Sequence, residues 1–236
     1  MSLSTVSEII RELEDEIEKL TEQLYIAESP TYHTISITED LKVGKQVSNL
    51  RFDRIYPKML RKLSTTHWTP VNVAQVVTDL LVTKQGTKVL DVGSGCGKFC
   101  LIGAITKPDS QFFGIEQRSY LNEIARRASQ SFDLKNVSFL DGNMLRLDWN
   151  QYDAFYFFNP FWENKMSPFT RIDLTVAVSE NRFDMYVDTA RTRLEKLKKG
   201  TRVVTYHGFG GNFPNGYECE ASIPIGSGMI ELWVKQ

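Results

Sequence analysis

The residues of this sequence whose types and spacing could do chemistry begin with a glycine-rich turn. Residues 89–97 read Val-Leu-Asp-Val-Gly-Ser-Gly-Cys-Gly, so an apolar run leads into glycine at every second position. Glycines let the backbone turn tightly and let a ligand approach without a Cβ atom in the way. A carboxylate two positions before the first glycine suits a cationic ligand better than a pyrophosphate. The predicted ligand-binding residues here are Asp91, Gly93, Ser94, Gly95 and Gly97.

The spacing of this turn differs from two common nucleotide-binding motifs. A dinucleotide fingerprint, G-x-G-x-x-G, would need its third glycine at position 98, which is Lys98. The phosphate-binding pattern G-x-x-x-x-G-K-[ST] does not occur in the sequence. The spacing therefore counts against a nicotinamide-dependent oxidoreductase, which is kept as an alternative.

Two further strand-like runs end in polar residues. The first, residues 111–116, ends in an acidic residue roughly 20 positions after the glycines, where a carboxylate can hold the two hydroxyls of a ribose. The second, residues 137–141, is followed by an amide that could pair with an adenine edge and a thioether that could cover a ring face. The predicted nucleoside contacts are Glu116, Gln117, Gly142, Asn143 and Met144.

A fourth apolar run, residues 152–158, leads into Asn159-Pro160-Phe161-Trp162. The Asn159 side-chain oxygen and the Pro160 carbonyl can accept N–H bonds and so aim the lone pair of an amine. Phe161 or Trp162 can stack on a planar acceptor or hold an incipient cation by cation–π attraction. These four residues are the candidate catalytic set; the alternative is that the proline and the aromatics only cap and pack the loop.

Alternating strands and helices are expected to position these residues. Strands are predicted at 88–92, 112–115, 137–140, 154–158, 202–207, 217–223 and 229–234, and helices at 71–81, 99–105, 120–131 and 184–198. Such alternation predicts βαβ units, and hence an α/β fold with a mostly parallel, doubly wound sheet. The last two strands, which have no helix between them, predict an antiparallel hairpin at the C-terminus.

The first 65 residues are predicted to form a helical segment ahead of a catalytic domain at 66–236. Apolar residues recur at steps of three and four over residues 5–27, which predicts a long amphipathic helix. We expect this helix either to pack on its own domain or to pair with the same helix of a second chain in a homodimer. A second helix is expected over residues 51–63, with Pro57 near a start or a kink, whereas residues 31–50 show only weak periodicity.

Composition narrows the function classes. The 236 residues carry a formal net charge of −1, with 42% hydrophobic and 24% charged residues, as in ordinary globular proteins. Near-neutral charge argues against a nucleic-acid partner. No membrane helix and no signal peptide are expected. Three cysteines without further ligands at metal spacing predict neither a zinc site nor a disulfide framework, so no metal is expected and a cytoplasmic location fits best.

From about residue 67 to 236, the sequence resembles the class I S-adenosylmethionine-dependent methyltransferases. The resemblance rests on Asp91-x-Gly93-x-Gly95-x-Gly97, on Glu116, on Gly142-Asn143 and on Asn159-Pro160-Phe161-Trp162. It implies a Rossmann-like seven-stranded sheet with a terminal antiparallel hairpin, and S-adenosyl-L-methionine as the cofactor.

The same resemblance implies individual roles. The glycine turn would lie against the methionine part of the cofactor, with Asp91 near its amino group. Glu116 would hold the ribose, and Asn143 stands where the family often has Asp against the adenine amine. Thr69, in His67-Trp68-Thr69-Pro70, resembles the threonine that approaches the cofactor carboxylate in several amino-methylating members.

The motif after the fourth strand lies between two family patterns. Amino-methylating members carry Asp, Asn or Ser followed by Pro-Pro-aromatic, and here Phe161 replaces the second proline. The non-SET histone lysine methyltransferases carry Asn followed by Phe-Ala-Phe. The resemblance implies methyl transfer to a nitrogen on a protein side chain or a small molecule. A non-catalytic cofactor-binding scaffold acting through the N-terminal helix is kept as a second alternative.

Overall fold

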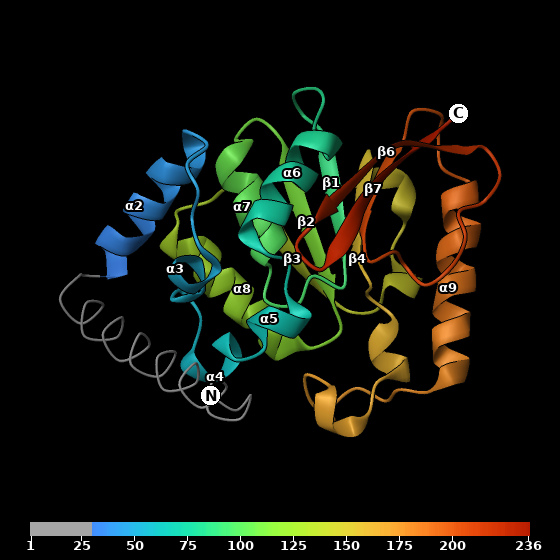
Figure 1. Cartoon of the computed structure of the whole chain (residues 1–236), viewed down its shortest axis with the longest axis horizontal. Helices are drawn as coiled ribbons and strands as arrows, with labels where there is room; N and C mark the ends of the chain where they lie inside the picture. The colour runs from blue at the N-terminus through green and yellow to red at the C-terminus, as the bar shows by residue number, and fades with distance from the viewer. Residues whose placement is uncertain (1–29) are drawn as a thin grey trace, which may run out of the picture.

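The computed structural model describes residues 30–236, which are built around a seven-stranded sheet (Figure 1). The strands are β1 (Lys88–Val92), β2 (Gln111–Glu116), β3 (Val137–Asp141), β4 (Ala154–Phe158), β5 (Arg202–Tyr206), β6 (Tyr217–Ile225) and β7 (Gly228–Lys235). Their order is β3-β2-β1-β4-β5-β7-β6. Strands β1 to β5 run parallel, and β7 is antiparallel to both of its neighbours. The predicted α/β fold with its C-terminal hairpin is confirmed.

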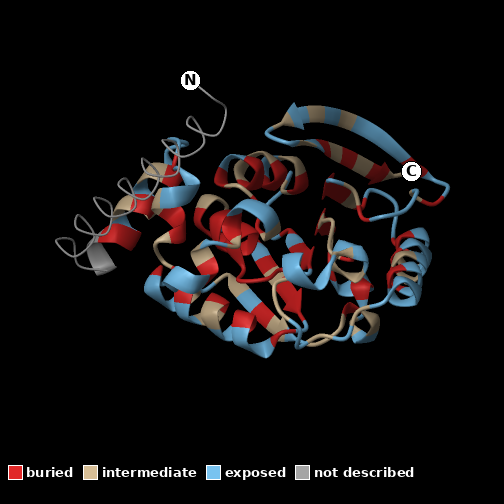
Figure 2. Ribbon diagram, turned by 60° about the horizontal axis from the view of Figure 1, so that its bottom comes forward, coloured by how far each residue is buried: buried red, intermediate tan, exposed pale blue. Residues whose placement is uncertain are grey.

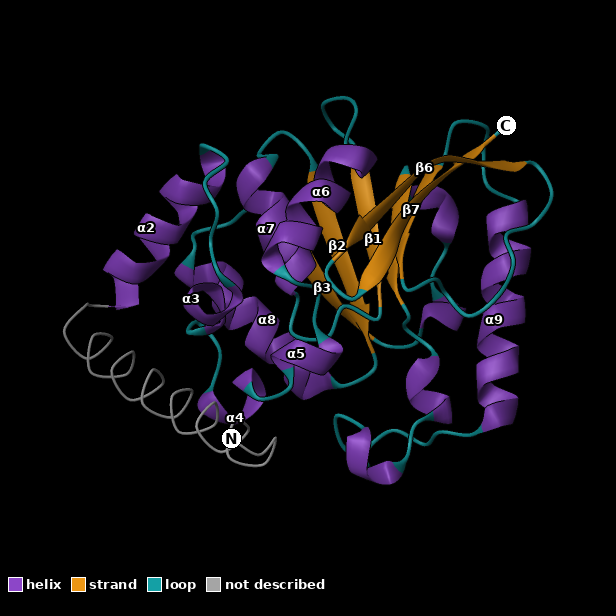
Figure 3. Cartoon of the chain, in the orientation of Figure 1, coloured by secondary structure: helices purple, strands orange, loops and turns teal. Residues whose placement is uncertain are grey.

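Helices cover both faces of the sheet (Figure 3). On one face lie α6 (Val71–Leu81), α7 (Lys98–Thr106) and α8 (Ser119–Ser131), and on the other lies α9 (Glu180–Glu195). Val89 of β1 belongs to the first core and its neighbour Leu90 to the second, because successive side chains of a strand point to opposite faces. This double burial explains why the central strands are continuous apolar runs.

The edge of the sheet is more open. Figure 2 shows the hairpin of β6 and β7 as a ribbon whose outer strand, β6, is largely exposed. Short 3-10 helices fill the connections near β4: η1 (Met144–Arg146), η2 (Trp149–Gln151), η3 (Trp162–Lys165) and η4 (Pro168–Thr170). The segment from η3 to α9 is therefore one long connection, and it leaves the sheet at the end of β4.

The N-terminal segment differs from its prediction in two places. A helix, α2 (Pro30–Lys42), occupies the stretch that has only weak periodicity. The single helix expected over residues 51–63 is broken into α3 (Asn49–Asp53) and α4 (Lys58–Arg61), and a further turn, α5 (Ser64–His67), follows. The break falls at Pro57, whose ψ of 141° is extended and whose ring removes a backbone donor.

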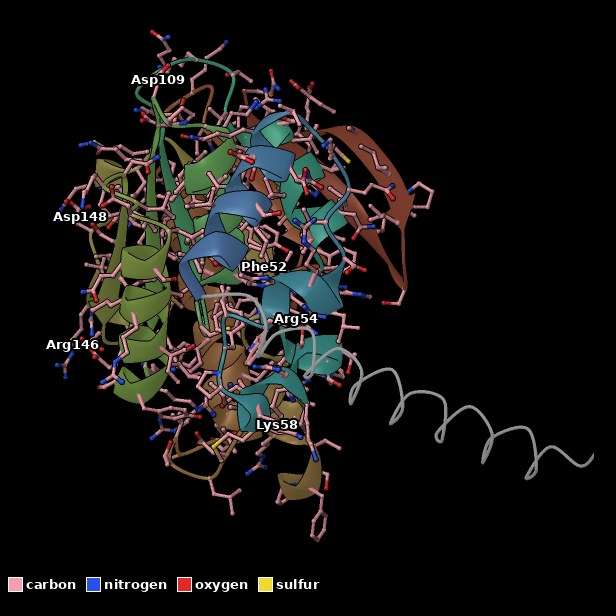
Figure 4. All side chains as sticks on the ribbon, turned by 90° about the vertical axis from the view of Figure 1, so that its left-hand side faces the viewer. Phe52, Arg54, Lys58, Asp109, Arg146 and Asp148 are labelled. Atoms are coloured by element: carbon pink, nitrogen blue, oxygen red, sulfur yellow. The ribbon has the colours of Figure 1, made fainter. Side chains whose placement is uncertain are left out.

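This described part of the N-terminal segment shares a core with the sheet. Ile37, Phe52 and Tyr56 pack in the same cluster as the buried residues of α6, α7 and α8. Figure 4 views this layer from its own side and labels Phe52. The division at residue 65 stays a prediction. The helix predicted over residues 5–27, with its dimer alternative, lies outside the described residues.

A buried ion pair connects the N-terminal segment to the start of α7, directly after the glycine turn. Lys98 begins α7, and its Nζ lies 2.7 Å from Oδ1 of Asp53. It also donates to Oδ1 of Asn49 at 3.1 Å, and both charged side chains are almost inaccessible to solvent. Within residues 30–236, no helix is long and apolar enough to cross a membrane.

Candidate active site

The glycine turn after β1 has the left-handed backbone that its residues allow. Gly93, Gly95 and Gly97 have φ angles of 81°, 53° and 78°, a region in which residues with a Cβ are strained. A Cβ on Gly97 would overlap the ring of Phe139, so this glycine lets α7 pack against the sheet. A Cβ on Gly93 would instead lie 2.9 Å from Cβ of Pro160, where the turn meets the motif after β4.

The acidic residue at the end of β2 is held in place by backbone donors. Glu116 is 7% exposed. Its Oε2 accepts from the N–H of Gly95 at 3.3 Å, and its Oε1 accepts from the N–H of Arg118 at 2.9 Å. Burial raises the pKa of Glu116, although these donors and the Arg118 guanidinium oppose the rise. The carboxylate is thus fixed between the glycine turn and the end of β2.

Asp91 lies deeper, beside the predicted cofactor threonine. A small cavity is lined by Thr69, Asp91, Gly93 and Ser94, among others. Oγ1 of Thr69 lies 3.0 Å from the hydroxyl of Tyr156, and both side chains are buried. Burial raises the pKa of Asp91 to about 8, and the Cys100 thiol that donates to it only partly opposes this shift. At neutral pH this carboxyl is therefore mainly protonated in the absence of a cation.

The predicted adenine contact Asn143 is engaged with protein groups. Its Oδ1 accepts from the N–H of Leu145 at 2.9 Å and so begins η1. Its Nδ2 donates to the hydroxyl of Tyr186 at 2.6 Å and to Oε1 of Gln117 at 3.2 Å. The side chain thus joins α9 to the end of β2, whereas the buried Met144 beside it lines the larger cavity.

The motif after β4 has one strained and one exposed residue. Asn159 has a φ of 44°, which is rare for a residue with a side chain. Phe161 is buried and stacks on Tyr186 at a centroid distance of 5.4 Å, so its role in the structure is packing. Trp162 is 47% exposed, and its ring is open to an acceptor.

A cavity of about 370 Å³ brings most of the predicted residues together beyond the carboxyl ends of β1, β2 and β4. In open α/β sheets, ligands bind at this edge. The predicted residues that line it are Gly93, Gly95, Glu116, Gln117, Gly142, Met144, Asn159, Pro160, Phe161 and Trp162. Thr69, Asp91 and Ser94 line the adjoining small cavity instead, and Gly97 and Asn143 line neither.

Sequence reasoning missed a buried cation, Arg118, that lines this cavity. The Arg118 side chain is 5% exposed, and its Nη2 lies 2.9 Å from Oε1 of Glu163. Its Nε lies 3.1 Å from Asp173, which also accepts from the hydroxyl of Tyr120 at 2.7 Å. The guanidinium also lies 3.7 Å from Glu116. Arg118 therefore ties the end of β2 to the loop after β4, a contact that no local motif could reveal.

The residues present fit S-adenosyl-L-methionine on two observations. The buried Glu116 faces the cavity where a ribose would be held. The indole N–H of Trp68 is buried without a hydrogen-bond partner among the described residues, beside Gly95, so a polar group of a ligand can satisfy it. When bound, the cofactor supplies a methyl group on a sulfonium, and the chain supplies the contacts that orient it.

Sequence comparison matches residues 83–191 to the family model of a methyltransferase domain. A protein-L-isoaspartate O-methyltransferase of Methanothrix thermoacetophila is 27% identical over 132 residues, which make up 53% of this chain and 60% of that protein. The family match thus covers the region that contains the glycine turn, Glu116 and Asn159.

Comparison with TrmN, a solved structure, shows the same fold. TrmN from Thermus thermophilus superimposes with a TM-score of 0.58 and 20% identity over 79% of this chain and 53% of that one. An RNA methyltransferase from Salinibacter ruber, in complex with S-adenosyl-L-homocysteine, gives 0.48 and 18% over 76% of this chain and 92% of that one. The chain thus spans only 60% of the Methanothrix protein and 53% of TrmN.

The matched domain, its glycine turn and the strand order define the class I S-adenosylmethionine-dependent methyltransferases, a Rossmann-like group of transferases. This chain carries a domain of that class, and its cofactor is S-adenosyl-L-methionine. The nicotinamide alternative is thereby set aside.

Proposed function

We propose that the chain transfers the methyl group of S-adenosyl-L-methionine to a nitrogen acceptor on a protein side chain or a small molecule. The observation that carries the proposal is that Asn159 and Glu116 line one cavity. Among the described residues, nothing hydrogen-bonds the side-chain amide of Asn159, so its oxygen is available to an N–H of an acceptor. The position of this motif between the amino-methylating and the histone-lysine patterns supports the same acceptor class.

The chain's contribution to this reaction is positioning. Methyl transfer from a sulfonium is an in-line displacement, and holding the two reactants in line accounts for much of its acceleration. Glu116 and the glycine turn fix the donor, while Asn159 and the Pro160 carbonyl aim the lone pair of the nitrogen. Trp162 can hold the cation that forms on the acceptor.

Binding of the cofactor is tested first. Calorimetric titration with S-adenosyl-L-methionine and with S-adenosyl-L-homocysteine should give heat with both. No heat with either would refute the proposal. NAD(P) should give no thermal stabilisation, and a clear stabilisation would restore the oxidoreductase alternative.

The acceptor class is tested with methyl-labelled cofactor and a cell lysate separated into protein, RNA and small molecules. Label in protein or small molecules that resists mild alkali supports a nitrogen acceptor, whereas alkali-labile label identifies a methyl ester, the kind of product expected from an O-methyltransferase. Label in RNA would overturn the prediction, made from net charge, that nucleic acid is not the acceptor. A cytoplasmic location stays a prediction from the cysteine content.

Deletion of residues 1–28 tests the scaffold alternative. Unimpaired methyl transfer and an unchanged oligomeric state would remove the proposal that the N-terminal helix is the working part. Loss of the dimer with retained methyl transfer would instead assign that helix to assembly.

A further inference from the structure

His207 lies at the end of β5, next to the candidate catalytic motif. Strands β4 and β5 pair in parallel with Phe158 opposite Tyr206, so Asn159 and His207 follow the paired ends of two neighbouring strands. A backbone hydrogen bond continues this pairing beyond the strand ends: the N–H of Asn159 donates to the carbonyl of Gly208 at 3.1 Å. His207 and Asn159 both line the cavity.

Both residues have a left-handed backbone. Asn159 has a φ of 44° and His207 a φ of 60°. Residues with side chains adopt this region rarely, and where they do the surrounding structure must hold them in it. Asn159 and His207 thus follow adjacent strand ends with the same backbone conformation, and both line one cavity.

The imidazole of His207 lies between Phe158 of β4 and the hairpin of β6 and β7. It stacks on the ring of Phe158 at a centroid distance of 5.8 Å and an angle of 28°. A Cβ on Gly228, at the start of β7, would lie 2.5 Å from the ring, so this position leaves room only for glycine. Nε2 lies 3.5 Å from Oγ of Ser227, which also lines the cavity. These contacts fix the ring while its edge stays exposed to solvent.

A second histidine at the cavity, His67, provides a contrast. It is partly buried, and burial is the main cause that lowers its pKa. His207 is exposed instead, and among the described residues its Nδ1 has no hydrogen-bond partner.

We propose that His207 is a catalytic residue that accepts the proton which the nitrogen acceptor loses on methylation; this inference rests on the proposed function. An ammonium acceptor has no lone pair, so one of its N–H protons goes first to Nδ1 of His207, and the neutral amine then attacks the methyl group. A carbon–nitrogen bond forms, the carbon–sulfur bond of the cofactor breaks, and the electron pair of that bond stays on sulfur. Solvent finally takes the proton from the exposed ring, so that one proton is released overall. Imidazole is suited to this exchange near neutral pH.

The first test needs no acceptor. The chain has three histidines, His33, His67 and His207, and their ring resonances are followed by NMR in protein saturated with each cofactor form. If His207 lies at the reacting sulfur, its resonances shift on binding and differ between the sulfonium and the thioether form, because only the sulfonium is charged. Those of His33, which is 3% exposed and hydrogen-bonded to Arg51, stay constant. Identical His207 resonances in both forms would overturn the proposal.

The second test measures methyl transfer to the unfractionated lysate. His207→Asn keeps a side chain that tolerates a left-handed backbone but cannot take up a proton. We expect roughly a 100-fold loss of rate, with binding of S-adenosyl-L-homocysteine unchanged. His207→Gly, whose backbone is unstrained, should lose as much, and added imidazole should restore part of the rate. Wild-type rates in both variants would refute the role of His207.

A matched control separates the ring from the backbone. Asp133 is another residue with a left-handed backbone, at a φ of 52°, and it lies on the surface outside the cavity. Asp133→Asn should leave the rate unchanged. If the wild-type protein binds neither cofactor form, the proposed function fails; if it binds both and His207 does not respond, only the present inference fails.

Discussion

Gly93 and Pro160 touch across the site: a Cβ on the glycine would lie 2.9 Å from Cβ of the proline. The turn that is predicted to hold the cofactor and the motif predicted to hold the acceptor are therefore in direct contact. A side chain on Gly93 must displace one of them. Together with the φ of 81°, this close approach makes Gly93 unfavourable for any residue that has a side chain.

Gly93→Ala should therefore weaken cofactor binding beyond the effect of backbone strain. The strain of a left-handed alanine is about 1–2 kcal/mol of unfolding free energy. Gly44→Ala is the matched control, because Gly44 has a φ of 73° and no atom within 4 Å of its Cβ position. We expect both variants to lose stability in urea, Gly93→Ala more because its Cβ displaces Pro160. Only Gly93→Ala should lose roughly tenfold in affinity for S-adenosyl-L-homocysteine, or about 1.4 kcal/mol. Equal affinities would contradict the contact's importance.

Glu116→Gln should lower the affinity for S-adenosyl-L-homocysteine by roughly 10- to 100-fold, since hydrogen bonds to a charged group contribute about 1.5–3 kcal/mol. Asp173→Asn serves as the control, because Asp173 also pairs with Arg118 but does not line the cavity. Calorimetry should show an affinity close to that of the wild type for the control. A similar loss in both variants would mean that the Arg118 network, and not a ribose contact, sets the affinity.

Cofactor binding should release a proton from Asp91. Desolvation raises the pKa of Asp91 from 3.8 to about 8, so the folded chain keeps this proton at neutral pH. A cofactor ammonium beside it favours the charged form and expels the proton. Titration with S-adenosyl-L-homocysteine at pH 7, in buffers of different ionisation enthalpy, should reveal a release approaching one proton, and Asp91→Asn should release none.

The same carboxyl makes a prediction for stability. In the unfolded chain it ionises above its ordinary pKa of 3.8, whereas in the folded chain it stays protonated up to about pH 8. The unfolded state thus binds fewer protons in this window, and the contribution of Asp91 to the unfolding free energy falls as pH rises across it. Asp91→Asn should flatten this dependence in chemical denaturation at pH 5 and pH 8. An unchanged slope would place the titration elsewhere.

The sequence predicted the sheet and its strand-end residues because their signals are local. The run 88–92, the glycine spacing and Glu116 are each read within a few residues, and the structure brings the last two into one cavity. The α2 helix was missed because its stability comes from packing Ile37 and Leu41 into a core that the periodicity does not show. The Arg118 network joins residues up to 55 positions apart, and no spacing rule predicts it.

Lys98 illustrates the same limit. In the sequence, Lys98 only stands where a dinucleotide motif would need a glycine. In the structure, it forms a buried ion pair with Asp53 that connects the N-terminal segment to α7. Lys98→Met should lower the unfolding free energy by about 3–5 kcal/mol, because it leaves a buried charge uncompensated. Adding Asp53→Leu should recover much of this loss. A loss below about 1 kcal/mol in the single variant would show that the pair is not needed.

Replacing Asn159 separates acceptor positioning from cofactor binding. Asn159→Gly removes the amide and keeps the backbone free to adopt a φ of 44°, whereas Asn159→Ala also adds strain. Both should reduce the rate of methyl transfer to the lysate roughly 100-fold, since misplacement of a reacting atom by about 1 Å has such an effect. Affinity for S-adenosyl-L-homocysteine should stay nearly intact in the glycine variant. The glycine variant differs from the wild type only in lacking this side chain. An unchanged rate in it would therefore reject Asn159 as the group that orients the acceptor.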